Sequence, residues 1–285
     1  MKNIFDRKLV FITGGSSGIG QARAKDLTGR GANVYIVSRK LENLTETIVQ
    51  LKAMKIHQDQ LIGLISADVS NDKHFAQMMC NLCERVGVPD YLINSAGIVF
   101  PGSVLDLDLK VFRNIMDVNF FGVVSATKAI LPKMIEKGSG HIINISSFVG
   151  FFASYGYSAY GSSKFAVRGF SDVLRAEVKP YGIKVSVVFP ADTDTPQLAF
   201  ERAHQPPIMR EINATAGEMS AEKTAEAILH GISKNTYAIT PGIEPTLAYW
   251  ITNIAGYLQR PLIDSTIASA RKKMEANASK KAKKF

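Results

Sequence analysis

The sequence predicts a doubly wound α/β fold, in which a mainly parallel sheet has helices on both faces. Short apolar runs alternate with longer stretches of helical periodicity along the 285 residues, which is the order that such sheets require. The first apolar run leads directly into a glycine-rich turn and a helix, an arrangement typical of phosphate-binding α/β units. Later runs, such as residues 183–189, are mostly apolar, as expected of strands covered by helices on both faces.

Length and composition fit one large domain followed by an extension. The chain is 46% hydrophobic, which is enough for a substantial core. We assign residues 1–241 to the α/β domain, residues 242–270 to an apolar helical extension and residues 271–285 to a basic tail without fixed structure. The first strand, residues 9–12, runs straight into glycines, so we expect no signal peptide and a cytoplasmic protein.

The excess of basic residues is concentrated in the tail. The net charge is +9, and residues 271–285 hold seven basic residues against one acidic residue, Glu275. A tail rather than a groove carries this charge, which argues against a nucleic-acid partner.

No metal site is expected. Cys80 and Cys83 form a single C-x-x-C in a stretch of helical periodicity, and the five histidines are scattered. Zinc sites need more ligands at defined spacings, so we interpret both cysteines as core thiols.

The first strand is followed by a turn with the pattern T-G-x-x-x-G-x-G. Strand, turn and helix in this order place backbone N–H groups and a helix N-terminus where a pyrophosphate can bind. The residues expected to contact a dinucleotide here are Gly14, Ser16, Ser17, Gly18, Ile19 and Gly20.

The residue after the second strand, residues 33–38, indicates which dinucleotide binds. Sites for NADH usually carry Asp or Glu about 20 residues past the glycines, where it binds the ribose 2′-hydroxyl. This chain has Arg39 instead. A guanidinium pairs with a 2′-phosphate, so we expect NADPH. The alternative is an exposed loop arginine that binds no ligand.

Polar and small residues follow the third and fourth strands, residues 61–66 and 91–94. Asp68 either accepts a hydrogen bond from the adenine amino group or caps the helix that begins near Asn71. Small residues after the fourth strand let the backbone approach a cofactor. From these loops we assign to cofactor binding Asp68, Val69, Asn94, Ala96 and Gly97.

A proton-donating pair is predicted on the helix after the fifth strand. Tyr160 and Lys164 are four residues apart and therefore share one helix face. A phenol with an ordinary pKa of about 10 is a poor acid at neutral pH, and a nearby ammonium lowers that pKa. Ser147 follows the apolar run of residues 141–145, where its hydroxyl is placed to polarise a carbonyl. Tyr-x-x-x-Lys alone is common on amphipathic helices, so the prediction depends on its neighbours.

One amide falls inside a long helical pattern, residues 109–134. Asn119 lies there among apolar residues and must find partners if it is buried. It either bonds to backbone or holds a water molecule.

Together these motifs resemble the short-chain dehydrogenase/reductase family, whose fold is the Rossmann fold, over about residues 8–241. The matching sequences are TGGSSGIG at 13–20, NSAG at 94–97, Asn119, Ser147 and YGSSK at 160–164. Ser95 stands where the family more often has asparagine, which should change the turn only slightly.

The resemblance implies a set of roles for these residues. Tyr160 would be the general acid of ketone reduction, Ser147 would hydrogen-bond the substrate carbonyl, and Lys164 would bind the nicotinamide ribose and lower the tyrosine pKa. Asn119 would hold a water in a proton relay. The resemblance also implies a homodimer or homotetramer, hydride transfer from NADPH, and cofactor contacts from Pro190, Thr193 and Thr195.

A narrower resemblance lies after the sixth strand. Residues 190–196, P-A-D-T-D-T-P, are similar to a signature of the 3-ketodihydrosphingosine (3-oxosphinganine) reductases. It implies reduction of 3-oxosphinganine to sphinganine, a step of sphingolipid biosynthesis. Asp192 or Asp194 would then pair with the substrate ammonium, or both cap the following helix. The alternatives are another lipid-like carbonyl (a 3-oxoacyl thioester, a steroid or a retinoid) and a non-enzymatic NADPH-binding regulator.

The segment after the last predicted strand, residues 236–240, is apolar and aromatic. Residues 246–263 are too short in their unbroken hydrophobic part to span a bilayer, which needs about 20 residues. They either lie at the cytoplasmic face of a membrane, aided by the basic tail, or pack against another subunit.

Overall fold

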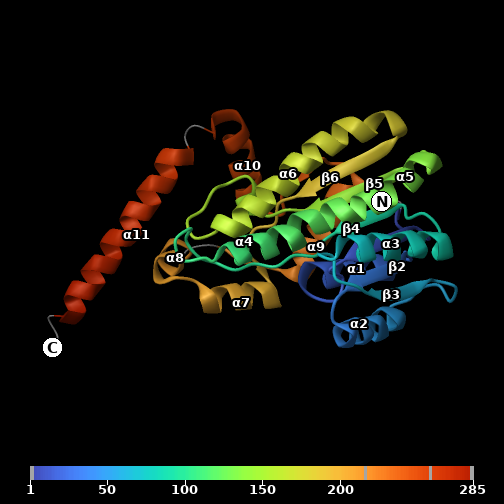
Figure 1. Cartoon of the computed structure of the whole chain (residues 1–285), viewed down its shortest axis with the longest axis horizontal. Coiled ribbons are helices and arrows are strands. Elements are labelled where there is room, and N and C mark those ends of the chain that lie inside the picture. The colour runs from blue at the N-terminus through green and yellow to red at the C-terminus, as the bar shows by residue number, and fades with distance from the viewer. Residues whose placement is uncertain (1–2, 215–216, 257–258, 283–285) are drawn as a thin grey trace.

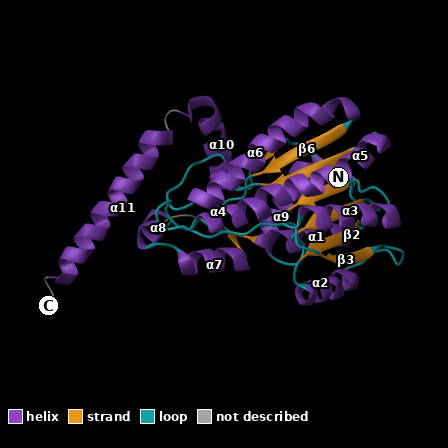
Figure 2. Cartoon of the chain, in the orientation of Figure 1, coloured by secondary structure: helices purple, strands orange, loops and turns teal. Residues whose placement is uncertain are grey.

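A seven-stranded parallel sheet lies at the centre of the computed structural model, which describes residues 3–214, 217–256 and 259–282 (Figure 2). The strand order is β3-β2-β1-β4-β5-β6-β9, so the chain winds outward from β1 in both directions. This confirms the predicted doubly wound fold. The strands are β1 (Leu9–Thr13), β2 (Asn33–Ser38), β3 (Ile62–Ser66), β4 (Tyr91–Asn94), β5 (Gly140–Ile145), β6 (Ile183–Val188) and β9 (Ala238–Ile239).

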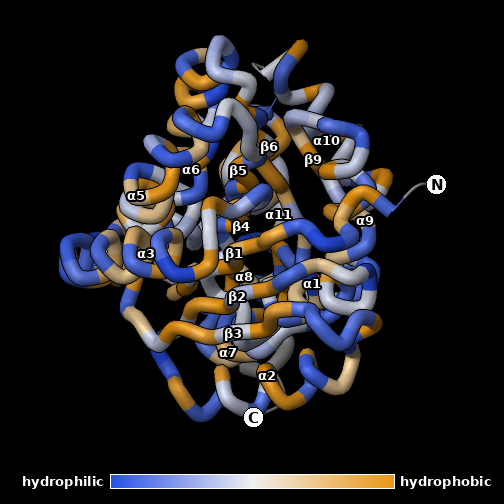
Figure 3. The backbone as a smooth tube through the Cα atoms, turned by 90° about the vertical axis from the view of Figure 1, so that its right-hand side faces the viewer, coloured by the Kyte–Doolittle hydropathy of each residue, from blue (hydrophilic) through white to orange (hydrophobic). Residues whose placement is uncertain are grey.

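Side chains alternate across the sheet and build one core on each face. In β1, Val10 and Ile12 belong to one core, and Leu9 and Phe11 belong to the other. Figure 3 shows the sheet between these two helical layers. The helices of the first core are α1 (Gly18–Gly29), α2 (Leu41–Ala53) and α9 (Ala221–Ser233). Those of the second are α3 (Asp72–Val86), α5 (Gly122–Lys137) and α6 (Ser158–Val178).

The predicted helix over residues 109–134 is divided. It consists of α4 (Leu109–Met116), a π-helical turn (Asp117–Phe121) and α5. Such π turns often occur at functional sites, and this one carries Asn119. Leu109–Lys137 is the one helical stretch of the described residues long and apolar enough to cross a membrane, but half of its apolar window is buried inside the protein.

Short elements cover the carboxyl end of the sheet. Two of them, α7 and α8, lie beyond the ends of the strands in Figure 1. Parallel α/β sheets bind ligands at this end, next to the point where the strand order reverses, here between β1 and β4. The covering elements are β7 (Thr193–Asp194), α7 (Pro196–His204), α8 (Pro207–Ile212) and β8 (Met219–Ser220).

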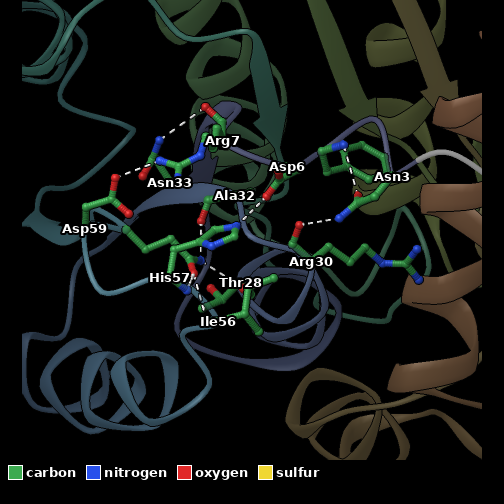
Figure 4. A network of polar contacts seen from close by, with 12 residues as sticks. Asn3, Asp6, Arg7, Thr28, Arg30, Ala32, Asn33, Ile56, His57 and Asp59 are labelled. Carbon is green, nitrogen blue, oxygen red and sulfur yellow. Dashed lines mark hydrogen bonds and ion pairs between the residues drawn. The ribbon is translucent and has the colours of Figure 1, made fainter.

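A polar network closes the amino end of the sheet (Figure 4). Arg7 Nη1 lies 2.7 Å from Asp59 Oδ2, and His57 Nε2 lies 2.7 Å from Asp6 Oδ1. These contacts tie the segment before β1 to the loop between α2 and β3. They stabilise the end of the sheet that lies away from the ligand-binding end.

The C-terminal residues form two helices, α10 (Ile243–Ala255) and α11 (Gln259–Ala282). Helix α11 extends away from the sheet beside α8 in Figure 1, and Ala270 of α11 is buried. The structure therefore differs from the expected tail without fixed structure up to residue 282; residues 283–285 lie outside the described residues. Lysine and alanine are common in this segment and are strong helix formers. Their helix propensity explains why the segment is helical although its run of like charges predicted no fixed structure.

Candidate active site

The loops at the carboxyl ends of the strands enclose a cavity of about 490 Å³. Residues far apart in the sequence line its wall, from the glycine turn to the loop after β6. The predicted site residues that line it are Gly14, Ser17, Gly18, Ile19, Gly20, Gly97, Ser147, Tyr160, Lys164, Pro190, Asp192, Thr193 and Thr195. The fold thus gathers most of the predicted site around one cavity.

The glycine turn forms one end of this cavity. Gly14 has φ +69°, and a Cβ atom there would lie 2.7 Å from the backbone of Ala96. Helix α1 begins at Gly18, and the side chain of its N-cap, Ser17, makes no capping hydrogen bond within the described chain. Free N–H groups at a helix N-terminus attract anions. This end of the cavity therefore fits the pyrophosphate of a dinucleotide.

Tyr160 and Lys164 lie side by side in the middle of the cavity wall. Both are nearly fully buried, and Lys164 Nζ lies 5.6 Å from the centre of the tyrosine ring. The ammonium donates a hydrogen bond of 3.0 Å to the carbonyl oxygen of Ile145, at the end of β5. Burial lowers the pKa of Lys164 to about 8.

The pKa of Tyr160 differs from the sequence expectation. Burial raises it above its ordinary value, the neighbouring Ser147 hydroxyl lowers it, and Glu201 raises it further. The ammonium of Lys164 lies over the ring and donates to the Ile145 carbonyl, and the pKa of Tyr160 remains raised despite it. In this arrangement the phenol keeps its proton across the whole neutral range.

Asn119 uses its whole amide to fasten the loop after β4. Its Oδ1 accepts a hydrogen bond from Ile98 N at 2.8 Å, and its Nδ2 donates to Ile98 O at 2.9 Å and Ser163 Oγ at 3.0 Å. Of the two alternatives for this residue, the side chain thus takes the bonds to backbone. The water of a proton relay stays a prediction.

Several predicted cofactor residues lie behind the cavity wall. The side chain of Asn94 is buried in the sheet and donates to Asn144 Oδ1 of β5 at 2.9 Å. The backbone of Ala96 packs closely against Gly14. The strand pleat turns the Asn94 side chain into the core, and the approach of the backbone after β4 to a cofactor stays a prediction. The predicted residues that do not line the cavity are Ser16, Arg39, Asp68, Val69, Asn94, Ala96, Asn119 and Asp194.

Arg39 and Asp68 face each other at the ends of β2 and β3. Arg39 Nη1 lies 3.6 Å from Asp68 Oδ2, and both side chains remain partly exposed. Asp68 Oδ1 also accepts hydrogen bonds from the backbone N and Oγ of Ser70. Asp68 therefore forms a local turn, whereas the N-cap position of α3 belongs to Asn71.

The two aspartates after β6 have different surroundings. Asp192 lines the cavity, whereas Asp194 lines a separate cavity of about 610 Å³ beside α1 and α9. Neither caps α7, because Thr195 Oγ1 accepts the capping hydrogen bond from Leu198 N at 3.2 Å. Only Asp192 remains a candidate for substrate contact.

Several cavity residues were not predicted from the sequence, and two of them are hydrogen-bonded to each other. Glu201 of α7 and Tyr157, just before α6, both line the cavity, and the tyrosine hydroxyl donates a short hydrogen bond to Glu201 Oε1. A glutamate in a charged helix carries no signal of burial. Its position depends on how α7 packs over the end of the sheet.

Ser95, the departure from the family motif, has a partner that the motif does not reveal. Arg23 of α1 is fully buried and donates to Ser95 Oγ at 3.0 Å and Ile19 O at 3.3 Å. Burial lowers the pKa of Arg23 to about 9. The small serine accommodates this guanidinium beneath the glycine turn.

Comparisons with known proteins agree with this geometry. A model of the short-chain dehydrogenase family matches residues 8–206. A 3-ketodihydrosphingosine reductase of Bos taurus is 36% identical over 221 residues, which are 77% of this chain and 67% of that protein. Dehydrogenase/reductase SDR family member 7B of Xenopus laevis is 34% identical over 290 residues, covering 95% of this chain and 83% of that protein.

Solved structures share the fold. A short-chain dehydrogenase/reductase from Burkholderia phymatum, in complex with NAD, has a TM-score of 0.78 at 22% identity and covers 90% of this chain and 96% of its own. A short-chain dehydrogenase from Streptomyces avermitilis has a TM-score of 0.74 at 27% identity, with coverage of 96% and 98%. The match to the family model and these relatives show that the chain belongs to the short-chain dehydrogenase family of oxidoreductases.

Proposed function

We propose that this protein reduces 3-oxosphinganine to sphinganine with NADPH as the hydride donor. The observation that carries the proposal is the cavity in which Tyr160 and Ser147 meet beside the glycine turn. Relatives named 3-ketodihydrosphingosine reductase in Bos taurus, Mus musculus and Dictyostelium discoideum, at 35–36% identity, support the substrate. Apolar residues of the cavity wall, among them Phe148, Phe152 and Leu198, suit a long hydrocarbon chain.

The side chains supply the proton and the orientation of the ketone. Ser147 Oγ donates a hydrogen bond to the ketone oxygen, and Tyr160 Oη transfers its proton to that oxygen as the carbonyl carbon becomes tetrahedral. The nicotinamide cofactor, when bound, supplies the hydride that reaches the carbonyl carbon. The Ser147 hydroxyl, which offsets part of the rise that burial causes in the pKa of Tyr160, stabilises the tyrosinate that remains, and a solvent proton then restores the phenol. Lys164, beside the phenol ring, would bind the nicotinamide ribose.

The substrate is tested by NADPH oxidation with the purified protein in detergent micelles. The substrates are 3-oxosphinganine, its analogue without the amine, and an acetoacetyl thioester. We expect selective turnover of the amino ketone. Preference for a neutral substrate would assign the protein to another lipid-like carbonyl, and no turnover of any ketone would favour the non-enzymatic regulator.

The preference for NADPH is proposed from Arg39. This guanidinium is partly exposed at the end of β2, and Asp68 is its ion-pair partner at 3.6 Å. Arg39→Asp should lower kcat/KM for NADPH by about tenfold or more and shift preference toward NADH, since a phosphate then meets a carboxylate. The control is Arg30→Asp, which alters an arginine at the far end of α1. Unchanged preference in Arg39→Asp would show that the 2′-phosphate is bound elsewhere.

We also propose that α10 touches an anionic membrane surface. One face of this helix is exposed and apolar: Ile243 and Ile254 are each 80% exposed, and Trp250 is 59% exposed. On the other face Pro245 and Ala248 line the cavity, so the helix lies between the exterior and the site. Tryptophan favours the headgroup level of a bilayer, and each basic residue near an anionic surface adds about 1 kcal/mol. Arg271 and Lys272 of α11 provide such charges, whereas Lys273 is paired with Glu211 at 2.9 Å.

Vesicle sedimentation tests the membrane contact. We expect the protein to pellet with vesicles containing phosphatidylglycerol and less with phosphatidylcholine alone, and Trp250→Ser with Ile254→Asn should weaken binding about tenfold or more. Val49→Ser, at an exposed apolar position on α2, should not. The contrary result is a wild-type protein that fails to bind vesicles and forms a dimer that the same double variant dissociates. That result would identify the exposed face of α10 as a subunit interface.

A further inference from the structure

The cavity combines an anion-binding turn with an excess of carboxylates. Its lining contains one cationic side chain, Lys164, and three carboxylates, Asp192, Glu201 and Glu244. The glycine turn, with its backbone N–H groups, lies at the anion-binding end. The carboxylates from the loop after β6 and from α7 and α10 mark a region of the same cavity that suits a cation.

Glu201 is unusual for a carboxylate because it is only 7% exposed. Its Oε1 accepts both hydrogen bonds that reach the group, from the Tyr157 hydroxyl and from Gln205 Nε2 at 3.0 Å. Among the described residues, Oε2 receives no hydrogen bond and no ion pair. Glu201 lines the cavity and its Oε2 is not sealed off inside the protein, so a cation in the cavity can reach this oxygen.

The nearby protein charge compensates these carboxylates only in part: burial keeps the pKa values of both Glu201 and Asp192 raised, although Arg202 lowers each of them. The cation beside Glu201, Arg202, is bound to Glu218 at 2.7 Å and lies outside the cavity lining. Burial raises the pKa of Glu201, and the negative charge of Asp192 raises it further. Two carboxylates that repel each other across a cavity are stabilised by a cation placed between them.

Glu201 is also close to the reacting centre. Tyr157, whose hydroxyl binds Glu201, has its ring centre 6.1 Å from that of Tyr160. Tyr160 feels both Glu201 and Asp192, because each raises its pKa. Glu201 and Asp192 therefore act on the phenol that would protonate the ketone, and the ammonium of a 2-amino ketone is one carbon away from that carbonyl.

From these contacts we infer that Glu201 and Asp192 form a binding site for the ammonium group of a 2-amino ketone substrate, with Tyr157 holding Glu201 in place. The inference rests on the proposed reduction of an amino ketone and identifies what selects it. The same carboxylates disfavour the anionic 3-oxoacyl thioesters of coenzyme A, because like charges repel.

The test compares kcat/KM for 3-oxosphinganine with that for its deaminated analogue, which differs by the ammonium alone. Glu201→Gln keeps the size of the side chain and an acceptor for Tyr157 but removes the charge. We expect the ratio of the two kcat/KM values to fall about tenfold or more in Glu201→Gln, mainly through KM for the amino ketone. Asp192→Asn should lower the ratio as well.

Asp194→Asn is the matched control, because it neutralises a carboxylate two residues from Asp192 that lines a different cavity. Its ratio should equal that of the wild type. Should Glu201→Gln fail to fold, which a thermal unfolding curve reveals, Asp192→Asn carries the test.

The possible results distinguish a wrong ammonium site from a wrong substrate. A wild-type enzyme without preference for the amine contradicts the proposed substrate itself. A wild-type enzyme that prefers the amine, with Glu201→Gln and Asp192→Asn keeping the wild-type ratio, overturns the ammonium site alone. Equal losses on both substrates would likewise overturn it, since they indicate a structural role.

Discussion

Tyr160→Phe is expected to lower kcat for ketone reduction by about 10²- to 10⁴-fold, the usual contribution of a positioned general acid. The substitution removes one oxygen from a buried ring and leaves the packing against Tyr157 and Val149 in place. In the proposed mechanism this phenol, whose pKa burial raises, carries the proton that the alkoxide receives. Steady-state NADPH oxidation measures the loss.

Binding of NADPH should survive the change, because the glycine turn is untouched. Fluorescence titration of NADPH into Tyr160→Phe should give a Kd within about threefold of the wild type, since no charge is altered. Tyr181→Phe, at an exposed position, is the matched control for both measurements. Near-normal turnover in Tyr160→Phe would show that another group delivers the proton.

Gly20→Ala is expected to destroy the cofactor end of the cavity. A Cβ atom on Gly20 would lie 2.2 Å from the carbonyl oxygen of Gly14, and backbone cannot yield as a flexible side chain does. The start of α1 and the turn must therefore move apart. Overpacking of this kind costs about 1–3 kcal/mol or more in the free energy of unfolding, and the displaced N–H groups should raise the Kd for NADPH at least about tenfold.

Gly29→Ala provides the control within the same helix. There the new Cβ atom would meet only the Cε of Met54, at 3.9 Å, which is an ordinary contact. Urea unfolding and NADPH titration should therefore separate the two variants clearly. Equal stability and equal Kd values for both would mean that the turn is not the phosphate-binding element.

Local sequence patterns were enough to predict most of the fold. Apolar runs such as β1 and β6 were recognisable because strands of a covered parallel sheet need little polarity. The boundaries shifted by a residue or two. The larger differences came where local rules compete, as in the π-helical turn at Asn119, where the amide binds the Ile98 backbone.

The placement of the site followed from strand ends and short spacings. Tyr160 and Lys164 are one helical turn apart, and the glycine turn directly follows β1, so their placement needs little more than secondary structure. The directions of the side chains at and after the end of β4 were not predicted. Asn94 turned into the sheet because alternate residues of a strand point to opposite faces.

The sequence by itself determined the α/β fold, the glycine turn at one end of the cavity and the meeting of Ser147, Tyr160 and Lys164, because periodicity and short spacings are local properties of the chain. Only the tertiary structure decided that Asp192 rather than Asp194 faces the cavity, and that Glu201 lies beside it. Both positions depend on how the loop after β6 and α7 pack over the end of the sheet. Contacts such as that between Tyr157 and Glu201 join distant segments of the chain, and the spacing of neighbouring residues does not encode them.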